Sequence, residues 1–587
     1  MQLFLDRVRA VRGWSYVPSP EEAGAIAQIV RRLDGIPLAI ELAAARMNVL
    51  SPTQMAHGLA KPLELLTAGA RGARARQATL RGAIQWSWEL LSPLEREALA
   101  QCSIFRGGFS LEAAKAVVGV TAQTDAVLDL IQALREKSLL RIYQDGLAAR
   151  QLRFGMYDAI REFVAEQLGD SAARLEISSR HTRYFLQIAE RWHGAVHRRG
   201  GPEALGALAV DSENLLSAFE RECAKTPRTV ENAEAALRLA LYLDPLLAMR
   251  GPVETHQATL NAALSVSAGL PVDLSLRGRV LRAHAVMSQT RGNIGDATRA
   301  FTDALSSARR AADAVLEGTL LVDLSILHRE QGRMGESEGA VRAAAQLQTT
   351  DPWLRAYLHG NSGILEYELG RHENAEQHYA TALNLLRQIG DRRFEGVFET
   401  NLGLLYREQR RLAEARIHYE KGIAALREVG DRRFEGMSLD CLATTLWEEG
   451  RGGEAKVYAQ RALKMLQDAG DRRASAIAMA HLGGMSASLG QLEDAGAAFA
   501  EVDGLISGMD DPALRAEAEL SRGHLELALS RAAGDLQQAS RHQSLAQAKL
   551  ASLQPDVLAG SSDVRVAVRR LAADLHSSAL RRTVPPL

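Results

Sequence analysis

The sequence predicts an all-α fold in which most of the chain forms stacked helix pairs. The tetrapeptide Gly-Asp-Arg-Arg occurs three times at a fixed interval, at residues 390–393, 430–433 and 470–473. A period of about 40 residues is typical of solenoid proteins, whose repeats stack side by side. Within a repeat, small, large and small residues follow one another as at Ala415, Tyr419 and Gly422, a spacing that places them on one stripe of a helix.

Glycine marks the turn between the two helices of each repeat. Counted from these glycines, about eight units of ~40 residues span residues 231–555. The glycines are Gly251, Gly292, Gly332, Gly370, Gly450, Gly490 and Gly534, with Arg410 in the glycine position of one copy. In the tetrapeptide, glycine suits the left-handed backbone just past a helix end. The residues that follow are expected to cap the next helix, and they are Asp391, Asp431 and Asp471.

The helices of a repeat carry a recognisable pattern. Asn-Leu-Gly-Leu-Leu-Tyr at 401–406 and Arg-Leu-Ala-Glu-Ala at 411–415 resemble the tetratricopeptide repeat. This resemblance implies a right-handed superhelix whose groove binds a protein partner or an effector. The candidate partner-binding residues are Arg392, Arg432, Arg472 and Tyr406. The three arginines could form a basic strip for an acidic partner or ion pairs between repeats, and we favour the ion pairs.

The N-terminal part of the chain resembles a second family. Gly-Ile-Pro-Leu-Ala at 35–39 is followed by Thr79–Ser92 and Ile104–Ala114, in the order found in bacterial signal-transduction ATPases with numerous domains. That group includes the NB-ARC proteins and the maltose-activator-like regulators. The resemblance implies three further segments: a remnant helical subdomain at 1–78, a winged-helix subdomain at 79–170, and a helical connector at 171–230 that breaks near Gly200. The arginines at the other end of the chain mark a basic C-terminal tail at 556–587.

The winged-helix segment has predictable elements. Strands are expected at 138–143 and 152–155, joined by a wing at 144–146 and followed by a helix over 157–168. The candidate recognition helix at 125–136 carries nearly balanced charge, which is unfavourable for phosphate contacts. We therefore do not expect this segment to bind DNA.

In the resembled ATPases a proline packs beside the adenine of bound nucleotide, and a Met-His-Asp motif faces the phosphates. The resemblance implies vestigial ADP contacts at Pro37 and Tyr157. Tyr157 stands where the motif of the family has its histidine. A purely structural role for both residues is the alternative. Phosphate binding also needs a Gly-x-x-x-x-Gly-Lys-Ser/Thr loop, which this sequence lacks. We expect no enzyme activity and no cofactor, unless a missing N-terminal part supplies the phosphate-binding core.

The composition argues against several classes of partner. With Lys+Arg 70 and Asp+Glu 71, the chain has no overall field that attracts nucleic acid or an anionic membrane. Three distant cysteines favour a reducing compartment, and no apolar run reaches about 18 residues, so we expect a cytoplasmic protein. His193 and His197 are four residues apart without an intervening glutamate. With His181 they are predicted to be solvated surface histidines rather than zinc ligands.

Two functional hypotheses remain. The first is a non-catalytic signalling sensor or scaffold that binds a protein or effector in the repeat groove. The second is an ATP/ADP-dependent switch, or a transcriptional regulator, whose nucleotide-binding core is missing from this chain or supplied in trans. The resemblance to full-length ATPases also leaves a homo-oligomer open. The basic tail is interpreted as a solvated terminal helix.

Overall fold

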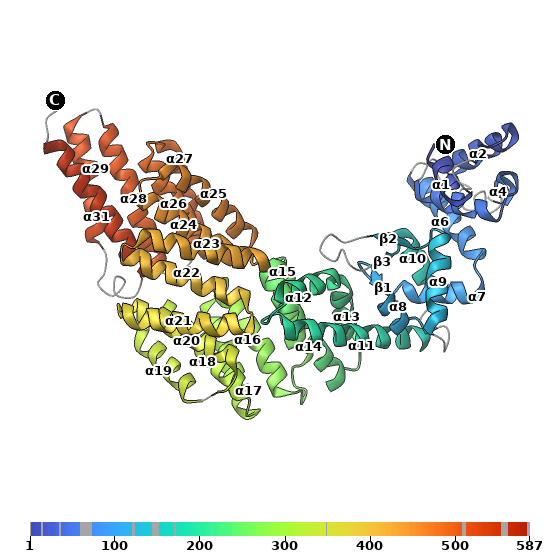
Figure 1. Ribbon diagram of the computed structural model, residues 1–587, viewed down its shortest axis with the longest axis horizontal. Coiled ribbons are helices and arrows are strands. Elements are labelled where there is room, and N and C mark those ends of the chain that lie inside the picture. Colours follow the sequence, from blue (N-terminus) through green and yellow to red (C-terminus); the bar gives the residue numbers. More distant parts are fainter. Residues whose placement is uncertain are drawn as a thin grey trace. The chain divides into compact units, whose positions relative to one another are not determined.

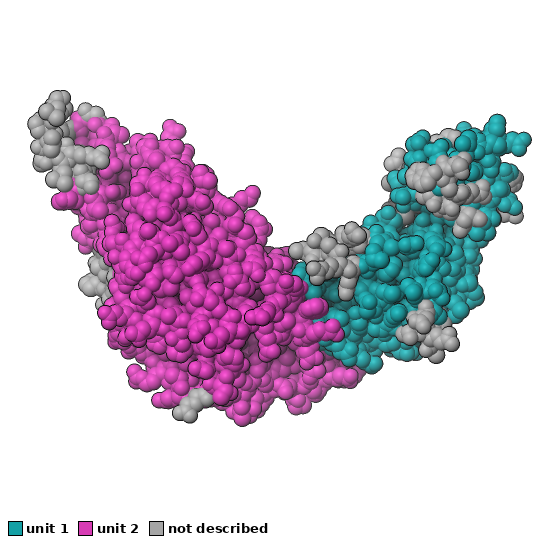
Figure 2. Space-filling view, in the orientation of Figure 1, with its two compact units in different colours: residues 1–189, 206–221 teal, residues 190–205, 222–587 magenta. Residues whose placement is uncertain are grey.

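The computed structural model describes residues 2–12, 16–33, 37–58, 73–119, 124–143, 152–168, 172–347, 349–507, 512–533, 535–552 and 562–583. It is almost entirely helical, which confirms the all-α prediction (Figure 1). The chain divides into two compact units, coloured in Figure 2: unit 1 is Met1–Ala189 with Gly206–Arg221, and unit 2 is Glu190–Leu205 with Glu222–Leu587. Among the described residues, no helix is both long enough and apolar enough to cross a membrane.

Unit 1 begins with short helices around an apolar core. They are α1 (Gln2–Arg12), α2 (Pro20–Arg32), α3 (Pro37–Ala45), the 3-10 turn η1 (Arg46–Asn48), α4 (Pro52–Gly58) and α6 (Ala73–Glu89). Phe4, Ile29 and Met47 are completely buried in this core. Because α6 is one continuous helix, the predicted boundary between residues 78 and 79 falls inside it.

The next elements of unit 1 include a small antiparallel sheet. They are α7 (Pro93–Cys102), β1 (Phe109–Ser110), α8 (Leu111–Val117), α9 (Thr124–Glu136), β2 (Arg141–Tyr143), β3 (Arg153–Gly155) and α10 (Asp158–Gln167). The strand order is β1-β3-β2, with Phe109 opposite Phe154 and Arg141 opposite Gly155. Strands β2 and β3 lie within the two predicted strands. Strand β1 was not predicted, because two residues are too few to show alternation.

The structure does not test two predictions for this region, the wing and the winged-helix assignment. The expected wing at 144–146 lies outside the described residues. The assignment of residues 79–170 to a winged helix stays a prediction, although the recognition-helix candidate and the helix after the strands are present as α9 and α10.

The predicted connector consists of α11 (Ala172–Ala195), α12 (Gly201–Val210) and α13 (Ser212–Ala224), and the chain passes between the two units within these helices. The expected break lies at Gly200, whose φ of +91° favours glycine. The prediction of solvated histidines is wrong for His181 and His193, which α11 turns inward. Burial lowers the pKa of His181 to about 3 and the pKa of His193 to about 4, so both imidazoles are neutral.

The described residues of unit 2 contain the predicted helix pairs, followed by helix α31 (Ser562–Thr583). The pairs are α14 (Val230–Arg250) with α15 (Val253–Val266), α16 (Leu274–Thr290) with α17 (Ile294–Arg310), α18 (Ala314–Glu330) with α19 (Met334–Gln346), α20 (Pro352–Glu368) with α21 (His372–Ile389), α22 (Arg392–Glu408) with α23 (Leu412–Val429), α24 (Arg432–Glu448) with α25 (Gly452–Asp468), α26 (Arg472–Ser488) with α27 (Leu492–Ile506), and α28 (Pro512–Ala532) with α29 (Leu536–Ala551).

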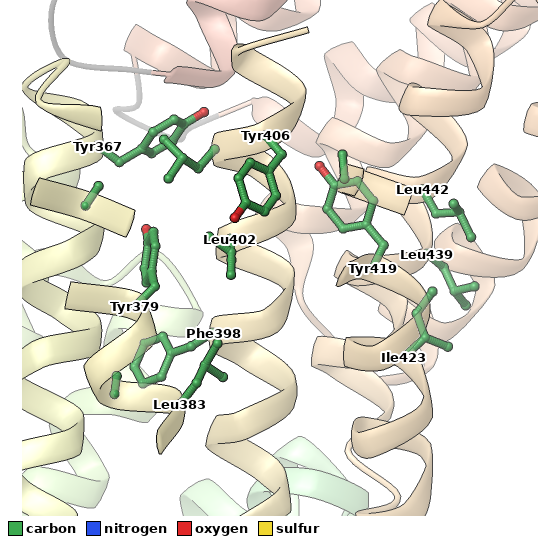
Figure 3. Close-up of a cluster of buried hydrophobic side chains, with 14 of the residues drawn as sticks. Tyr367, Tyr379, Leu383, Phe398, Leu402, Tyr406, Tyr419, Ile423, Leu439 and Leu442 are labelled. Atoms are coloured by element: carbon green, nitrogen blue, oxygen red, sulfur yellow. The ribbon is translucent and has the colours of Figure 1, made fainter. Parts of the chain in front are cut away.

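The packing between the two helices of a repeat explains the small-large-small stripe. Tyr379 and Tyr419 are completely buried, and Figure 3 shows them among the apolar side chains of successive helices. A Cβ atom at Gly403 would lie 2.7 Å from the Tyr419 ring, and one at Gly363 would lie 2.8 Å from the Tyr379 ring. In these two pairs the first helix carries a glycine because the aromatic ring of the second helix occupies that space.

The turns of the repeats follow the predicted chemistry. Gly390, Gly430 and Gly470 have φ values of 82°, 73° and 70°, and the aspartate after each accepts a backbone N–H from the next helix. Arg410, in the glycine position of its copy, adopts the same left-handed conformation with φ 65°. Gly251 differs, with φ −84°, and Gly534 lies outside the described residues.

The C-terminal tail is not a solvated helix as predicted. Val564, Leu571 and Leu575 of α31 are buried in a cluster with Leu520 and Leu527 of α28. These apolar residues recur at helical spacing and give α31 one face that packs on the last repeat. Helix α31 therefore belongs to the core of unit 2.

Candidate functional site

The aspartates that cap the repeat helices also join neighbouring repeats. Arg393 Nε donates a hydrogen bond to Asp431 at 2.8 Å, and Arg433 Nε donates to Asp471 at 2.7 Å. Both carboxylates are almost completely buried, whereas the arginines keep part of their surface in contact with solvent. Each carboxylate is therefore held inside the array, and the arginine paired with it keeps contact with solvent.

Asp391 occupies the same place in its repeat but has other partners. Its Oδ2 atom accepts the indole N–H of Trp353 at 3.0 Å and lies 3.0 Å from Nδ1 of His197. Its Oδ1 atom accepts the backbone N–H of Phe394 at 3.0 Å. Burial alone would raise the pKa of Asp391, but His197 and these hydrogen bonds outweigh it and lower the pKa. His197 is half-buried and bonded, which again corrects the prediction of a solvated histidine.

The three arginines proposed for partner binding lie beside this line of carboxylates. Their contacts are Arg392 with Glu428 at 2.9 Å, Arg432 with Asp468 at 3.9 Å, and Arg472 with the Leu505 carbonyl at 3.1 Å. Each contact joins the two helices of one repeat. The expected ion pairs between repeats are therefore made by Arg393 and Arg433, the second arginine of each tetrapeptide. Partner binding through the first arginine stays a prediction.

Unit 2 also encloses a hollow of about 200 Å³, lined by α14, α15 and α16 on one side and by the starts of α22 and α24 and the end of α25 on the other. We call it the Arg250 hollow. Its basic lining residues are Arg250, Arg282, Arg291, Arg393, Arg432 and Arg433. Its acidic lining residues are Asp244, Asp431 and Asp468. Trp353, Phe394, Val286 and Met287 add apolar surface to the lining.

Arg250 connects the two sides of the hollow. Its guanidinium donates to the Val429 carbonyl at 2.6 Å. A Cβ atom at Gly430 would lie 2.6 Å from Arg250 Nε, so the glycine of the tetrapeptide admits the arginine as well as the left-handed turn. Burial lowers the pKa of Arg250. The glycine that ends α23 thus has a second role that the local sequence does not reveal.

Two polar pairs hold residues of the lining in place. Arg282 donates to Asp323 at 2.5 Å, and Asp323 also accepts the hydroxyl of Tyr357 at 2.8 Å. Burial disfavours the charged guanidinium, but Asp323 outweighs it and raises the pKa of Arg282. Asp244 lies 2.8 Å from Nε2 of His256. These pairs fix the side chains that face the hollow.

The predicted nucleotide contacts lie in unit 1. Pro37 is exposed at the first position of α3. Tyr157 is half-buried at the start of α10, under the Arg141 guanidinium, which lies 4.5 Å from the ring centroid. Tyr157 also lines a hollow of about 460 Å³ to which Pro37 does not contribute. The structure gives these two residues no shared contact among the described positions, and nucleotide binding by them stays a prediction.

Tyr406 is a core residue. It is 8% exposed, its hydroxyl donates to Glu376 at 2.8 Å, and Arg411 lies 4.1 Å from its ring centroid. This geometry offers little surface to a partner. Within the parts of the chain that are described, no cluster of three or more histidine, cysteine or acidic residues is arranged to hold a metal ion.

Sequence reasoning did not find the Arg250 hollow. Arg250 and Gly430 are far apart in the chain and meet only because the array curves between them. Arg393 and Arg433 were visible in the tetrapeptide, but the sequence does not say which arginine of each pair faces the neighbouring repeat.

Comparison with known proteins addresses the repeat region directly. The tetratricopeptide repeat family matches residues 354–428, which correspond to α20 to α23. These residues are tetratricopeptide repeats. The flanking pairs from α16 to α19 and from α24 to α27 have the same glycine turns and aspartate caps. Helices α14, α15, α28 and α29 continue the succession of pairs, so we describe α14 to α29 as a tetratricopeptide array.

Similar proteins are known in several organisms. A Mycobacterium tuberculosis protein provisionally named an HTH-type transcriptional regulator is 33% identical over 294 residues, which are 49% of this chain and 32% of that protein. The chain thus spans about a third of the length of that relative. A signal transduction ATPase with numerous domains and a tetratricopeptide repeat sensor, from Pyrococcus horikoshii, is similar with 16% identity and a TM-score of 0.45, over 88% of this chain and 72% of that one. The quorum sensor NprR of B. thuringiensis is similar with 15% identity and a TM-score of 0.38, over 65% and 97%.

Proposed function

We propose that this chain is a non-catalytic signalling sensor or scaffold that binds a protein partner or an effector through its tetratricopeptide array. The observation that supports the proposal is the Arg250 hollow, where cationic, acidic and aromatic side chains from helices far apart in the sequence line one space. Tetratricopeptide arrays commonly bind their partners on extended surfaces of this kind. A ligand that contacts both sides of the hollow would link α14 to α24, and so couple binding to the curvature of the array.

The proposal includes the absence of catalysis in this chain. The sequence contains no Gly-x-x-x-x-Gly-Lys-Ser/Thr loop to cradle phosphates. Three cysteines are free, which suits our proposal that the protein acts in the cytoplasm.

The second candidate is a regulator whose nucleotide-binding core is supplied in trans or by a longer chain. The relative named as a transcriptional regulator supports it. This candidate requires that the chain, once combined with such a core, responds to ADP or ATP.

Two measurements test these proposals. Calorimetric titration of the purified chain with ADP and with ATP is expected to give no binding heat, and tight binding or hydrolysis would favour the switch.

Affinity capture from the source cells is expected to recover a partner with the native chain and to lose it with Arg250→Glu. Arg299→Glu is the matched control, because that side chain is 78% exposed on α17 and does not line the hollow. Light scattering of the same sample tests the homo-oligomer.

A further inference from the structure

We infer that the Arg250 hollow binds a small organic anion that combines one acidic group with a flat apolar portion. The inference rests on the proposed function and assigns a ligand class to it. Three observations carry it: the balance of charge that faces the hollow, the bonding of Arg250, and the aromatic wall beside the arginines.

The charge that faces the hollow is mainly positive. Among the lining arginines, Arg282, Arg393 and Arg433 are paired with carboxylates. Those carboxylates, on Asp323, Asp431 and Asp471, have side chains no more than 3% exposed. Asp323 and Asp471 do not line the hollow, although the arginines that pair with them do, and Asp431 lines it with a side chain that is only 1% exposed. An anionic group that enters therefore meets mainly guanidinium groups, and the paired carboxylates hold those cations in place.

The other arginines that line the hollow have no buried carboxylate as a partner among the described contacts. Arg250 has a backbone carbonyl as its hydrogen-bond acceptor, and Arg432 lies 3.9 Å from Asp468, with 58% and 46% of the two side chains exposed. Arg291 is exposed on the rim at the end of α16. Of the acidic lining groups, Asp244 is already paired with His256. An acidic ligand would provide Arg250 with the charged acceptor that the Val429 carbonyl does not supply.

The wall beside these arginines is apolar and partly aromatic. Trp353 and Phe394 pack edge to face with ring centroids 5.5 Å apart, and His197 lies 5.5 Å from Trp353. Val286, an apolar side chain 39% exposed, and the half-buried Met287 add apolar surface from α16. A bare inorganic ion would leave this apolar surface in water, whereas a ring attached to the acidic group would cover it. The volume of about 200 Å³ suits a small molecule rather than a folded segment.

The inference can be tested with 8-anilinonaphthalene-1-sulfonate, a fluorescent probe that carries a sulfonate on an aromatic ring system. Titration of the full chain in about 150 mM salt is expected to show one saturable site. Arg250→Gln is expected to weaken binding about tenfold, and Arg432→Gln about threefold, because each removes a charged donor. Arg299→Gln is the matched control and is expected to leave the affinity unchanged, since Arg299 lies outside the hollow.

N-phenyl-1-naphthylamine, which has the same rings without the sulfonate, separates charge from shape. Its affinity is expected to be the same in the native chain and in Arg250→Gln. The inference is overturned if Arg250→Gln and Arg299→Gln bind the sulfonate equally, or if the neutral probe is weakened as much as the anion. Arg432→Gln keeps the test decisive if Arg250→Gln does not fold, because Arg432 is exposed. Partner capture without arginine-dependent binding of the sulfonate would refute this inference alone, whereas ATP hydrolysis would refute the proposed function alone.

Discussion

The guanidinium of Arg393 donates from Nε to Oδ2 of Asp431 at 2.8 Å and thereby joins the start of α22 to the start of α24. The other oxygen of Asp431 accepts the backbone N–H of Phe434 at 3.1 Å and caps α24. One buried carboxylate therefore starts a helix and fixes the spacing of two successive repeats. This double use explains why aspartate follows glycine in each tetrapeptide.

Asp431→Asn is expected to lower the free energy of unfolding by about 2 kcal/mol. The amide still caps α24, but Arg393 loses the anion that compensates it. Asp431→Ala is expected to lower it by about 3 kcal/mol, because the cap is lost as well. Urea unfolding followed by circular dichroism measures both changes.

Arg432→Ala is the control for this pair of variants. Arg432 is 58% exposed and 3.9 Å from its carboxylate, so its removal is expected to change stability by less than about 1 kcal/mol. Equal losses for Arg432→Ala and Asp431→Asn would show that burial does not set the strength of these contacts.

His481 is expected to make the stability of unit 2 depend on pH. It is buried, with Nδ1 2.8 Å from Asp440 and Nε2 2.9 Å from Glu517. Burial opposes protonation, but the two carboxylates outweigh it and raise the pKa of His481 to about 9, from an ordinary value of 6.5. The stabilisation from the charged imidazole is therefore fully present below pH 6.5 and is lost as the pH rises to about 9.

Over that interval the free energy of unfolding is expected to fall by up to about 3 kcal/mol. His481→Gln should flatten the dependence, because glutamine does not titrate. Urea unfolding of both proteins at several pH values gives the comparison. If the free energy of unfolding of the native chain changes as little with pH as that of His481→Gln, then His481 is neutral in the folded protein.

The sequence predicted features of this fold that depend on neighbours along the chain. A left-handed turn and an aspartate cap involve only a few residues, so the tetrapeptide was enough to place them, and even Arg410 could be assigned to a turn. The pairing of Arg393 rather than Arg392 with the next repeat could not be predicted. It depends on the rotation of one repeat relative to the next.

The site was less accessible to sequence reasoning for the same reason. Arg250 meets the Val429 carbonyl 179 positions away, and no periodic signal links them. The packing of α31 was different, because Val564, Leu571 and Leu575 already had helical spacing in the sequence. The prediction of a solvated helix followed from the arginines of the tail and did not take that apolar face into account.

Gly360 and Gly339 provide opposite expectations for the same substitution. A Cβ at Gly360 of α20 would lie 2.0 Å from the Phe398 ring, whereas one at Gly339 of α19 would meet nothing within 4 Å. Gly360→Ala is expected to lower stability by about 3 kcal/mol because the ring must move. Gly339→Ala is expected to raise stability by about 0.5 kcal/mol, since alanine restricts the unfolded chain and favours the helix. Calorimetric melting of the two variants should shift in opposite directions, and shifts of the same sign would contradict the packing described for α20 and α22.

The basic residues of α31 are expected to contribute unequally to stability. The Arg570 side chain is 9% exposed, lies 3.3 Å from Glu448 and stacks over Trp447 with its guanidinium carbon 4.4 Å from the ring centroid. Arg569 is 44% exposed and lies 3.6 Å from Glu408. Arg570→Ala should therefore remove a buried ion pair and a cation–π contact and lower stability by about 2 kcal/mol.

Arg569→Ala is the matched variant on the same helix and should lower stability by less than about 1 kcal/mol, because its ion pair is exposed to solvent. Arg570→Ala should also expose Trp447 to water, which red-shifts the indole emission, and a Trp447→Phe background identifies that signal among the six tryptophans. If both arginine variants lose the same small amount and the emission does not move, then α31 is held by Leu571 and its apolar neighbours alone. A loss confined to Arg570→Ala means that the last helix is held by its charged contact with α24 as well as by its apolar face on α28.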